Sequence, residues 1–285
     1  MDAPSYILRL TCPDRVGIIA AIARFMEAED CFIARSRSFG DETDGRFFTR
    51  LSFHPTGSAF DAERFREGFA EVARELDADF DLHPEGRRVK TLIMVSRSDH
   101  CANALLYGAR SGELAIDPVA IVSNHPDLGP PLAHWGLPYH QVPVTGGNKS
   151  EAESRLFELV EQTGAELVVL ARYMQVLSDR ACARLEGRCI NIHHSFLPSF
   201  KGARPYHQAH ARGVKVVGAT AHYVTPDLDE GPIITQVVEP VDHTMGSQDL
   251  IQIGRHLEAA ALSRAVKAHA EHRIFINGTK TVVFA

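Results

Sequence analysis

Apolar residues between positions 5 and 82 follow two alternating periods, one typical of strands and one typical of helices. In chain order, the pattern predicts a strand at 5–10, a helix at 18–26, strands at 31–39 and 46–53, a helix at 61–76 and a strand at 79–82. Asp14 precedes the first apolar-periodic run and is the expected N-cap of that helix. The order βαββαβ predicts a ferredoxin-like sandwich of about 80 residues.

A polar, turn-rich connector at residues 83–88 divides the chain into expected domains of residues 1–86 and 87–285. In the second domain, strands are predicted at 89–95, 116–123, 139–144, 166–171, 189–193, 214–224 and 233–236, and helices at 102–109, 128–135, 150–162, 175–185 and 246–270. This alternation predicts an α/β domain with a doubly wound, mostly parallel sheet that binds ligands at the carboxyl ends of its strands. The tail predicts a β-hairpin that turns at Asn277-Gly278.

Length and composition allow two domains with hydrophobic cores, because the chain has 285 residues and 45% of them are hydrophobic. The formal net charge of -6 and the lack of a basic cluster argue against a nucleic-acid partner. No apolar run approaches a membrane span and no basic signal segment opens the chain, so no membrane partner is expected. The five cysteines are scattered without a C-x-x-C pair, which predicts reduced thiols in a cytoplasmic protein.

Candidate chemistry lies between residues 188 and 236. In the predicted strand 189–193, strand periodicity places Asn191 and His193 on one face. The polar loop 225–232 carries Asp227 and Asp229 and can fold back over the end of this strand. A carboxylate that orients an imidazole beside an amide suits acyl chemistry, because the His transfers protons and the amide N–H stabilises an oxyanion.

This stretch resembles the catalytic motif of the folate-dependent formyltransferase fold, in which an Asn, a His two residues later and an Asp in a D-x-G loop act together. The matching residues are Asn191, His193 and Asp229, with Asp227 as the near miss. The segments HHSFLP (193–198), GARPYHQA (202–209) and GATAHYV (218–224) resemble formyltetrahydrofolate deformylases most, and the resemblance extends to both ends of the chain. It implies hydrolysis of 10-formyltetrahydrofolate to tetrahydrofolate and formate, with formate supplied to purine synthesis and no cofactor beyond the folate substrate.

The choice of formyl acceptor depends on the loop after the first strand of the second domain. Glycinamide ribonucleotide transformylases share the Asn, His and Asp set and carry a glycine-rich phosphate loop there. Residues 96–101 of this chain, SRSDHC, contain no glycine, and Asp99 would repel a phosphate. Water is therefore the expected acceptor, and a transferase acting on another amine is the nearest alternative.

Residues 171–177, ARYMQVL, resemble the family's pterin-contacting segment. Met and Leu at helical spacing more often belong to a core, but the resemblance favours folate contact. The expected substrate-binding residues are Arg172, Met174, Val176, Leu177, Thr220 and His222. Arg204 either meets the folate glutamate or forms a salt bridge in a loop, and the sequence does not separate these roles.

Other chemistry is less well supported. Zinc hydrolases use clustered histidines, and five lie close in sequence, but they form no H-E-x-x-H motif, so no metal is expected: His193, His194, His207, His210 and His222. Cys189 is interpreted as a packed residue rather than a nucleophile. Ser195 lacks the G-x-S-x-G setting of a nucleophilic serine.

The first domain resembles the ACT domain, a regulatory module that binds amino acids and pairs with copies of itself, because a PDRVG turn follows its first strand. Backbone N–H groups at Gly17 could hold the carboxylate of an amino-acid effector, although a simple cap at Asp14 and packing at Gly17 explain these residues equally well. A homo-oligomer is expected. An amino-acid sensor that binds folate without turnover is a further alternative, against which the Asn191, His193 and Asp229 set argues.

Overall fold

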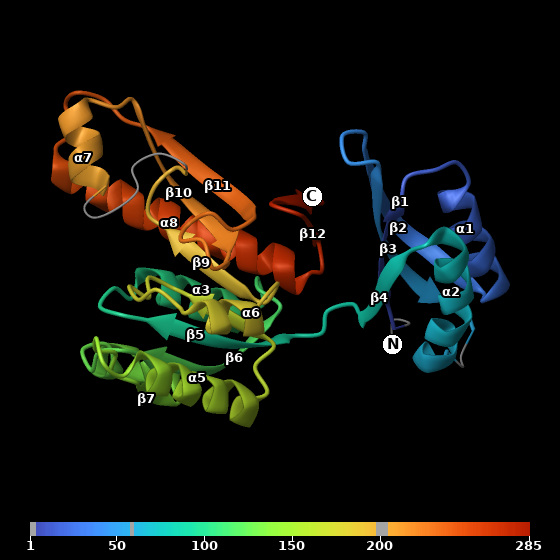
Figure 1. Ribbon diagram of the computed structural model, residues 1–285, viewed down its shortest axis with the longest axis horizontal. Helices are drawn as coiled ribbons and strands as arrows, with labels where there is room; N and C mark the ends of the chain where they lie inside the picture. Colours follow the sequence, from blue (N-terminus) through green and yellow to red (C-terminus); the bar gives the residue numbers. More distant parts are fainter. Residues whose placement is uncertain (1–3, 58–59, 198–204) are drawn as a thin grey trace. The chain divides into compact units, whose positions relative to one another are not determined.

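The computed structural model describes residues 4–57, 60–197 and 205–285, which form two compact units (Figure 1). The first unit runs to Arg87 and also includes Glu271–Phe275 and Val282–Ala285, whereas the second consists of Arg88–Ala270 and Ile276–Thr281. The boundary near Arg87 lies close to the predicted one. The predicted single domain of residues 87–285 differs from this division at its C-terminal end.

The first unit is an antiparallel sheet packed against two helices. Its elements are β1 (Tyr6–Pro13), α1 (Ile18–Ala28), β2 (Cys31–Asp41), β3 (Arg46–Pro55), α2 (Ala62–Leu76) and β4 (Asp79–Pro84). The sheet order β2-β3-β1-β4 and the connection βαββαβ confirm the predicted ferredoxin-like sandwich. In its core, Phe53 and Phe65 stack with ring centroids 5.1 Å apart.

The N-cap of α1 differs from the expectation. Gly17 occupies the N-cap with a left-handed φ of 97°, and its carbonyl accepts the N–H of Ala21. Asp14 donates its own N–H to the Gly45 carbonyl, and its carboxylate packs against Gly40. The prediction that Asp14 caps the helix is wrong, because a left-handed turn that glycine adopts without a Cβ penalty places the N-cap at Gly17, while the helix starts at Ile18 as predicted.

C-terminal residues complete the first unit. Phe275 packs against Phe48 with ring centroids 5.6 Å apart, and the Arg9 guanidinium lies 4.4 Å from the Phe275 ring centroid. Arg50 donates a 3.0 Å hydrogen bond to the Glu271 carbonyl. The predicted hairpin is confirmed as β12 (Ile274–Asn277) and β13 (Lys280–Val283), with a φ of 59° at Gly278.

The second unit contains a seven-stranded sheet in the order β11-β10-β9-β8-β5-β6-β7. Its strands are β5 (Val89–Val95), β6 (Ile116–Ser123), β7 (Tyr139–Gln141), β8 (Leu167–Leu170), β9 (Cys189–His193), β10 (Val216–Tyr223) and β11 (Ile233–Pro240). Strands β7, β6, β5, β8 and β9 run parallel, whereas β10 pairs antiparallel with both β9 and β11. The predicted doubly wound, mostly parallel sheet is confirmed.

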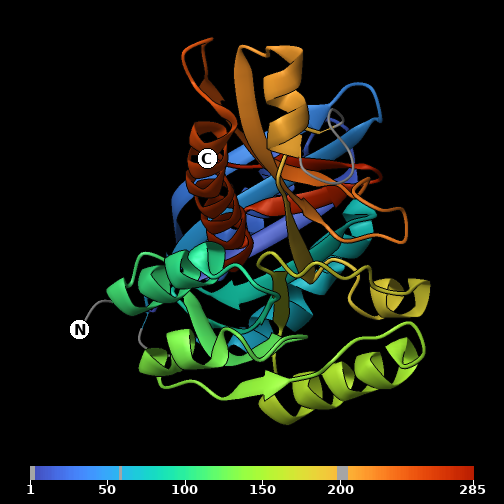
Figure 2. The same ribbon diagram turned by 90° about the vertical axis from the view of Figure 1, so that its left-hand side faces the viewer.

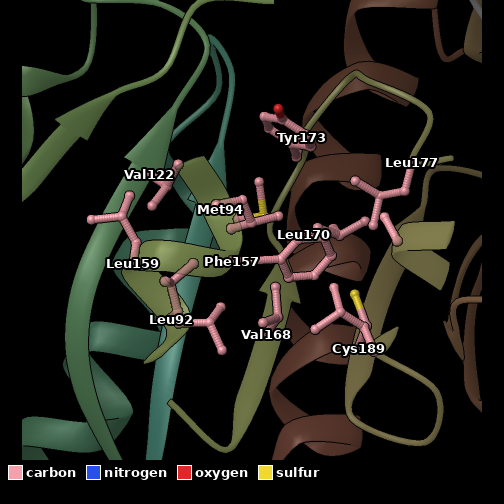
Figure 3. Close-up of a cluster of buried hydrophobic side chains, with 14 of the residues drawn as sticks. Leu92, Met94, Val122, Phe157, Leu159, Val168, Leu170, Tyr173, Leu177 and Cys189 are labelled. Carbon is pink, nitrogen blue, oxygen red and sulfur yellow. The ribbon is translucent and has the colours of Figure 1, made fainter. Parts of the chain in front are cut away.

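Helices cover both faces of this sheet (Figures 1 and 2). The helices are α3 (His100–Ser111), α4 (Gly129–Leu132) with a 3₁₀ turn (Ala133–Trp135), α5 (Lys149–Thr163), α6 (Asp179–Arg184), α7 (Pro205–Arg212) and α8 (Ser247–Ala270). Figure 3 shows the core cluster between the sheet and α5, where Leu92, Phe157, Leu170 and Cys189 are buried. None of the described helices is long and apolar enough to cross a membrane.

Helix α6 begins later than predicted. The helix starts at Asp179 rather than at residue 175, because the Ser178 hydroxyl caps it by accepting the Ala181 N–H. Glu153 fixes this cap by accepting the Ser178 N–H at 2.7 Å. Residues 175–177 are therefore non-helical, which changes the direction of their side chains.

Candidate active site

Two neighbouring strands carry the polar residues of the candidate site. Strand β9 ends at His193, and Asn191 precedes it by one strand period. Strand β10 runs antiparallel beside β9 and places Thr220 opposite His193 and His222 opposite Asn191. The register of the sheet therefore brings His222 beside the pair that the sequence singled out.

The loop after β10 selects Asp229 rather than Asp227 as the carboxylate. Asp229 has a left-handed φ of 58°, and its side chain reaches both His193 and His222. Gly231 follows where a Cβ would lie 1.8 Å from the Tyr223 carbonyl oxygen, so only glycine fits there. Asp227 is exposed and contributes its carbonyl to the turn.

His193, Asp229, His222 and Asn191 form one connected polar group. The Nδ1 atom of His193 lies 3.1 Å from Asp229 Oδ2, and the Nε2 atom of His222 lies 3.7 Å from Asp229 Oδ1. His222 Nδ1 is 2.8 Å from the Tyr223 carbonyl and must donate to it. In neutral His222, Nε2 is then an acceptor for the Asn191 amide N–H at 3.2 Å, which directs the amide nitrogen to this side.

Charge distribution makes His193 a competent proton acceptor. Burial raises the pKa of Asp229, but the hydrogen bond from His193 and the proximity of the His222 ring outweigh burial and hold that pKa well below its usual range. Asp229 is therefore an anion at neutral pH and accepts the Nδ1–H of His193. The buried Nε2 atom of His193 has no hydrogen-bond partner among the described residues.

An open pocket of about 230 Å³ adjoins this group. Met174, Val176 and Leu228 line it and are at least half exposed, so the pocket offers apolar surface beside polar atoms. Arg172 and His194 also line it. Such a combination suits a flat heteroaromatic ring that carries a reacting group.

Two of the predicted substrate-binding residues do not line this pocket. Leu177 is 8% exposed and belongs to the hydrophobic core, because the late start of α6 turns it inward. Thr220 is fully buried, donates to the Ser195 carbonyl at 2.9 Å and accepts the Leu197 N–H at 3.1 Å. The structure corrects both predictions: Leu177 packs, and Thr220 holds the segment that follows β9.

Comparisons with known proteins agree with this geometry. The Formyl transferase family model matches residues 89–266. A formyltetrahydrofolate deformylase from Corynebacterium sp. (strain P-1) is 49% identical over 98% of this chain and 97% of its own, and one from Bacillus subtilis (strain 168) is 39% identical over 97% and 93%. The chain belongs to the formyltetrahydrofolate deformylase family.

Solved structures separate this family from its neighbours. The deformylase structure from Burkholderia mallei matches with a TM-score of 0.94 and 49% identity over 99% of this chain and all of its own. Glycinamide ribonucleotide transformylase 1 from Symbiobacterium toebii matches with a TM-score of 0.67 and 28% identity over 72% of this chain and 98% of its own. The similarity to deformylases thus extends over both units.

Arg172, which lines the same pocket as Asn191, His193 and Asp229, belongs to a buried charged network that the sequence did not predict. Glu258 of α8 is 2% exposed, and its carboxylate accepts hydrogen bonds from Tyr206 Oη and His100 Nε2, each at 2.8 Å. Arg172 Nε lies 3.3 Å from the same carboxylate. Burial raises the pKa of Glu258, but its bonds to His100 and the charge of Arg172 lower it overall. The available signal was a lone acidic residue on the apolar stripe of a long helix.

The histidines do not assemble a metal site in the described part of this deformylase-family chain. His207 and His210 are exposed on α7 and do not line the pocket. His100, Cys101 and Glu258 place ligand atoms within 4.8 Å of one another. However, the Arg172 cation already pairs with Glu258, and burial raises the pKa of Cys101 and keeps it a thiol.

The structure also places Cys189 and Ser96. Cys189 is 1% exposed in the core, and burial raises its pKa, so it is a packed thiol. Ser96, in the glycine-free loop after β5, accepts the Met174 N–H at 2.9 Å and supports the pocket wall. Arg204 lies outside the described residues.

Proposed function

We propose that this chain hydrolyses 10-formyltetrahydrofolate to tetrahydrofolate and formate. The observation that carries the proposal is His193, with ionised Asp229 at Nδ1 and a buried, unpartnered Nε2 among the described residues. Asn191 lies beside it, and the apolar surfaces of Met174 and Val176 suit a pterin ring. Membership of the deformylase family supports the same activity. The formate released would supply purine synthesis.

Water is the nucleophile in the proposed reaction. His193 Nε2 takes a proton from water as the water oxygen attacks the formyl carbon, and Asp229 stabilises the resulting imidazolium. Asn191 donates its amide N–H to the oxyanion. The C–N10 bond then breaks, and the proton on His193 passes to N10 as tetrahydrofolate leaves. His193 and Asp229 act together as the base, because the Asp229 carboxylate accepts the Nδ1–H of His193.

Product formation in the absence of an amine acceptor tests this function. Purified protein should form tetrahydrofolate and formate in equal amounts from 10-formyltetrahydrofolate alone. Turnover only after an amine is added would show a transferase instead. Folate binding without any product, together with amino-acid binding by the first unit, would support the sensor alternative.

The reaction needs no metal or other cofactor in this proposal. His193 and Asp229 supply the proton transfer, and Asn191 supplies the oxyanion donor, so each step has a group of the chain itself. Activity that survives exhaustive chelation would support this. Loss of activity that zinc restores would contradict it.

The first unit is proposed to be an ACT-like regulatory and oligomerisation domain in a cytoplasmic homo-oligomer. Two features support self-association: β2 is an edge strand of its sheet, and it exposes Phe32 and Phe39. The left-handed turn at Gly17 leaves the N-terminus of α1 without a side-chain cap, which suits a carboxylate of an amino-acid effector. Sedimentation of the full chain, with and without added amino acids, tests both ideas.

A further inference from the structure

Arg172 is the only Lys or Arg among the described residues that line the pocket. It lies in the same pocket as His193 and His194, and its guanidinium also reaches buried Glu258. The residue has a left-handed φ of 66°, a conformation that glycine adopts freely and that is unfavourable for a long side chain. An unfavourable backbone conformation that is kept beside a reacting group suggests that the side chain has a task.

We infer that Arg172, anchored by Glu258, reserves the formyl group for water by excluding amine nucleophiles from the acceptor side of the site. The inference rests on the proposed hydrolysis and deepens it, because it names the residue that determines acceptor specificity. In hydrolysis, a water oxygen bonds to the formyl carbon and the C–N10 bond breaks. In amine transfer, the amine nitrogen bonds to the same carbon, the C–N10 bond breaks, and the proton lost by the amine passes to N10, so that a formamide and tetrahydrofolate leave.

Charge is the first basis for this selectivity. Aliphatic amines arrive mainly as ammonium ions at neutral pH, and a guanidinium cannot lose its proton to reduce the repulsion. The carboxylate of Asp229 offers little compensation, because His193 and His222 already hold it. Burial first, and then the Arg172 charge, lower the pKa of His194 to about 4, although Glu258 and Asp229 act in the opposite direction. Water carries no charge and is not repelled.

The second basis is that Arg172 is held in place. Its side chain is 17% exposed, and the Glu258 carboxylate beside it is fixed from two further elements, by His100 at the start of α3 and by Tyr206 on α7. If Arg172 were absent, buried Glu258 would become a counter-ion for an entering ammonium. The same carboxylate would then favour the acceptor that Arg172 excludes.

Product partition tests the inference. Wild type and Arg172→Gly are incubated with 10-formyltetrahydrofolate and millimolar glycinamide, and tetrahydrofolate, formate and N-formylglycinamide are measured. We expect formate as the product of the wild type, and at least a tenfold rise in the ratio of formylated amine to formate in Arg172→Gly. The glycine suits the left-handed backbone, and the ratio does not depend on the fraction of active protein. A residue with only a structural role would lower both products together and leave the ratio unchanged.

Matched variants keep the test decisive. Arg172→Lys retains a cation and should keep a low ratio of formylated amine to formate. Glu258→Gln weakens the contact that holds Arg172 and should raise this ratio. The Glu258→Gln result tests the inference even if Arg172→Gly folds poorly. The double variant Arg172→Gly with Glu258→Gln should lose much of the gain, because the counter-ion is gone. Met174→Ala shortens an uncharged side chain that lines the same pocket and should leave the ratio low. An unchanged ratio in both Arg172→Gly and Glu258→Gln, with formate still released, would overturn the inference, whereas a wild type that releases no formate would overturn the proposed function instead.

Discussion

Gly231 lies so close to Tyr223 that a Cβ atom on the glycine would stand 1.8 Å from the carbonyl oxygen of Tyr223. The Tyr223 N–H donates to the Pro232 carbonyl at 3.0 Å, so the loop closes tightly on the end of β10. Asp229 lies inside this closed turn and reaches His193 from it. The position of the carboxylate therefore depends on a residue that has no chemistry of its own.

Gly231→Ala should reduce kcat by roughly 100-fold or more, because a displacement of about 1 Å at a reacting group costs this much. The backbone must shift to admit the new methyl group, and Asp229 shifts with it. Gly147→Ala is the matched control, because a Cβ there meets nothing within 4 Å. Steady-state kinetics on both variants, with circular dichroism to confirm folding, check the prediction. Equal activity of the two variants would contradict it.

Asp229→Asn should lower kcat by about a thousandfold or more, since an amide cannot stabilise the imidazolium of His193 or fix its tautomer. Asp227→Asn, on the exposed part of the same loop, should remain near wild type. The pair of variants distinguishes a catalytic carboxylate from a general effect of loop charge. If both lose activity equally, the assignment to Asp229 fails.

The lowered pKa of Asp229 also predicts a pH dependence of stability. An aspartate in the unfolded chain has a pKa of about 3.9, so between the two pKa values the unfolded state binds more protons. The contribution of Asp229 to stability is then complete above about pH 5 and is lost as the pH falls through the folded pKa. Asp229→Asn should weaken the fall in stability below about pH 5. Urea unfolding followed by fluorescence of Trp135, the single tryptophan, measures this in the second unit; identical slopes in variant and wild type would refute it.

His222 and Asn191 should act as a coupled pair, because His222 Nε2 orients the Asn191 amide that donates to the oxyanion. A double-mutant cycle of His222→Ala and Asn191→Ala, read from kcat/KM, should give a coupling energy of about 0.5–3 kcal/mol. Replacing Tyr223 by Phe in the same cycle is the control, since its hydroxyl bonds His269 instead. Additive losses for His222→Ala and Asn191→Ala would show that His222 does not position the amide.

Periodicity predicted most of the fold because each unit buries one face of its helices, and the second unit also buries both faces of its central parallel strands. It could not predict the association of the tail with the first unit, since the Phe275 and Phe48 contact joins residues far apart in the sequence. The predicted N-cap of α1 was wrong for a local reason: a polar side chain was favoured as the cap, but a left-handed glycine occupies that position.

The site was predictable where strand period and spacing place side chains, as for Asn191 and His193. The positions of side chains were harder to predict where a helix cap or a strand register determines them. Ser178 caps α6 and makes the helix begin later than predicted, and the pairing of β9 with β10 buries Thr220. The role of Glu258 was not predicted, because its carboxylate contacts His100, Tyr206 and Arg172, which lie on three other segments of the chain. Burial of a charged group becomes visible only once those partners are placed.

The adjacent residues Val176 and Leu177 test whether Leu177 belongs to the hydrophobic core rather than to the folate-binding pocket. Leu177→Ala should lower the free energy of unfolding by about 2–5 kcal/mol, because it leaves a cavity in the core, while KM changes little. Val176 is 53% exposed in the pocket, so Val176→Ala should raise KM by about tenfold through lost contact with the folate and change stability by less than about 0.5 kcal/mol. Urea unfolding and steady-state kinetics on both variants measure the two effects separately. The reverse pattern, with KM raised by Leu177→Ala and stability lost in Val176→Ala, would restore the original sequence-based assignment of Leu177 to the folate.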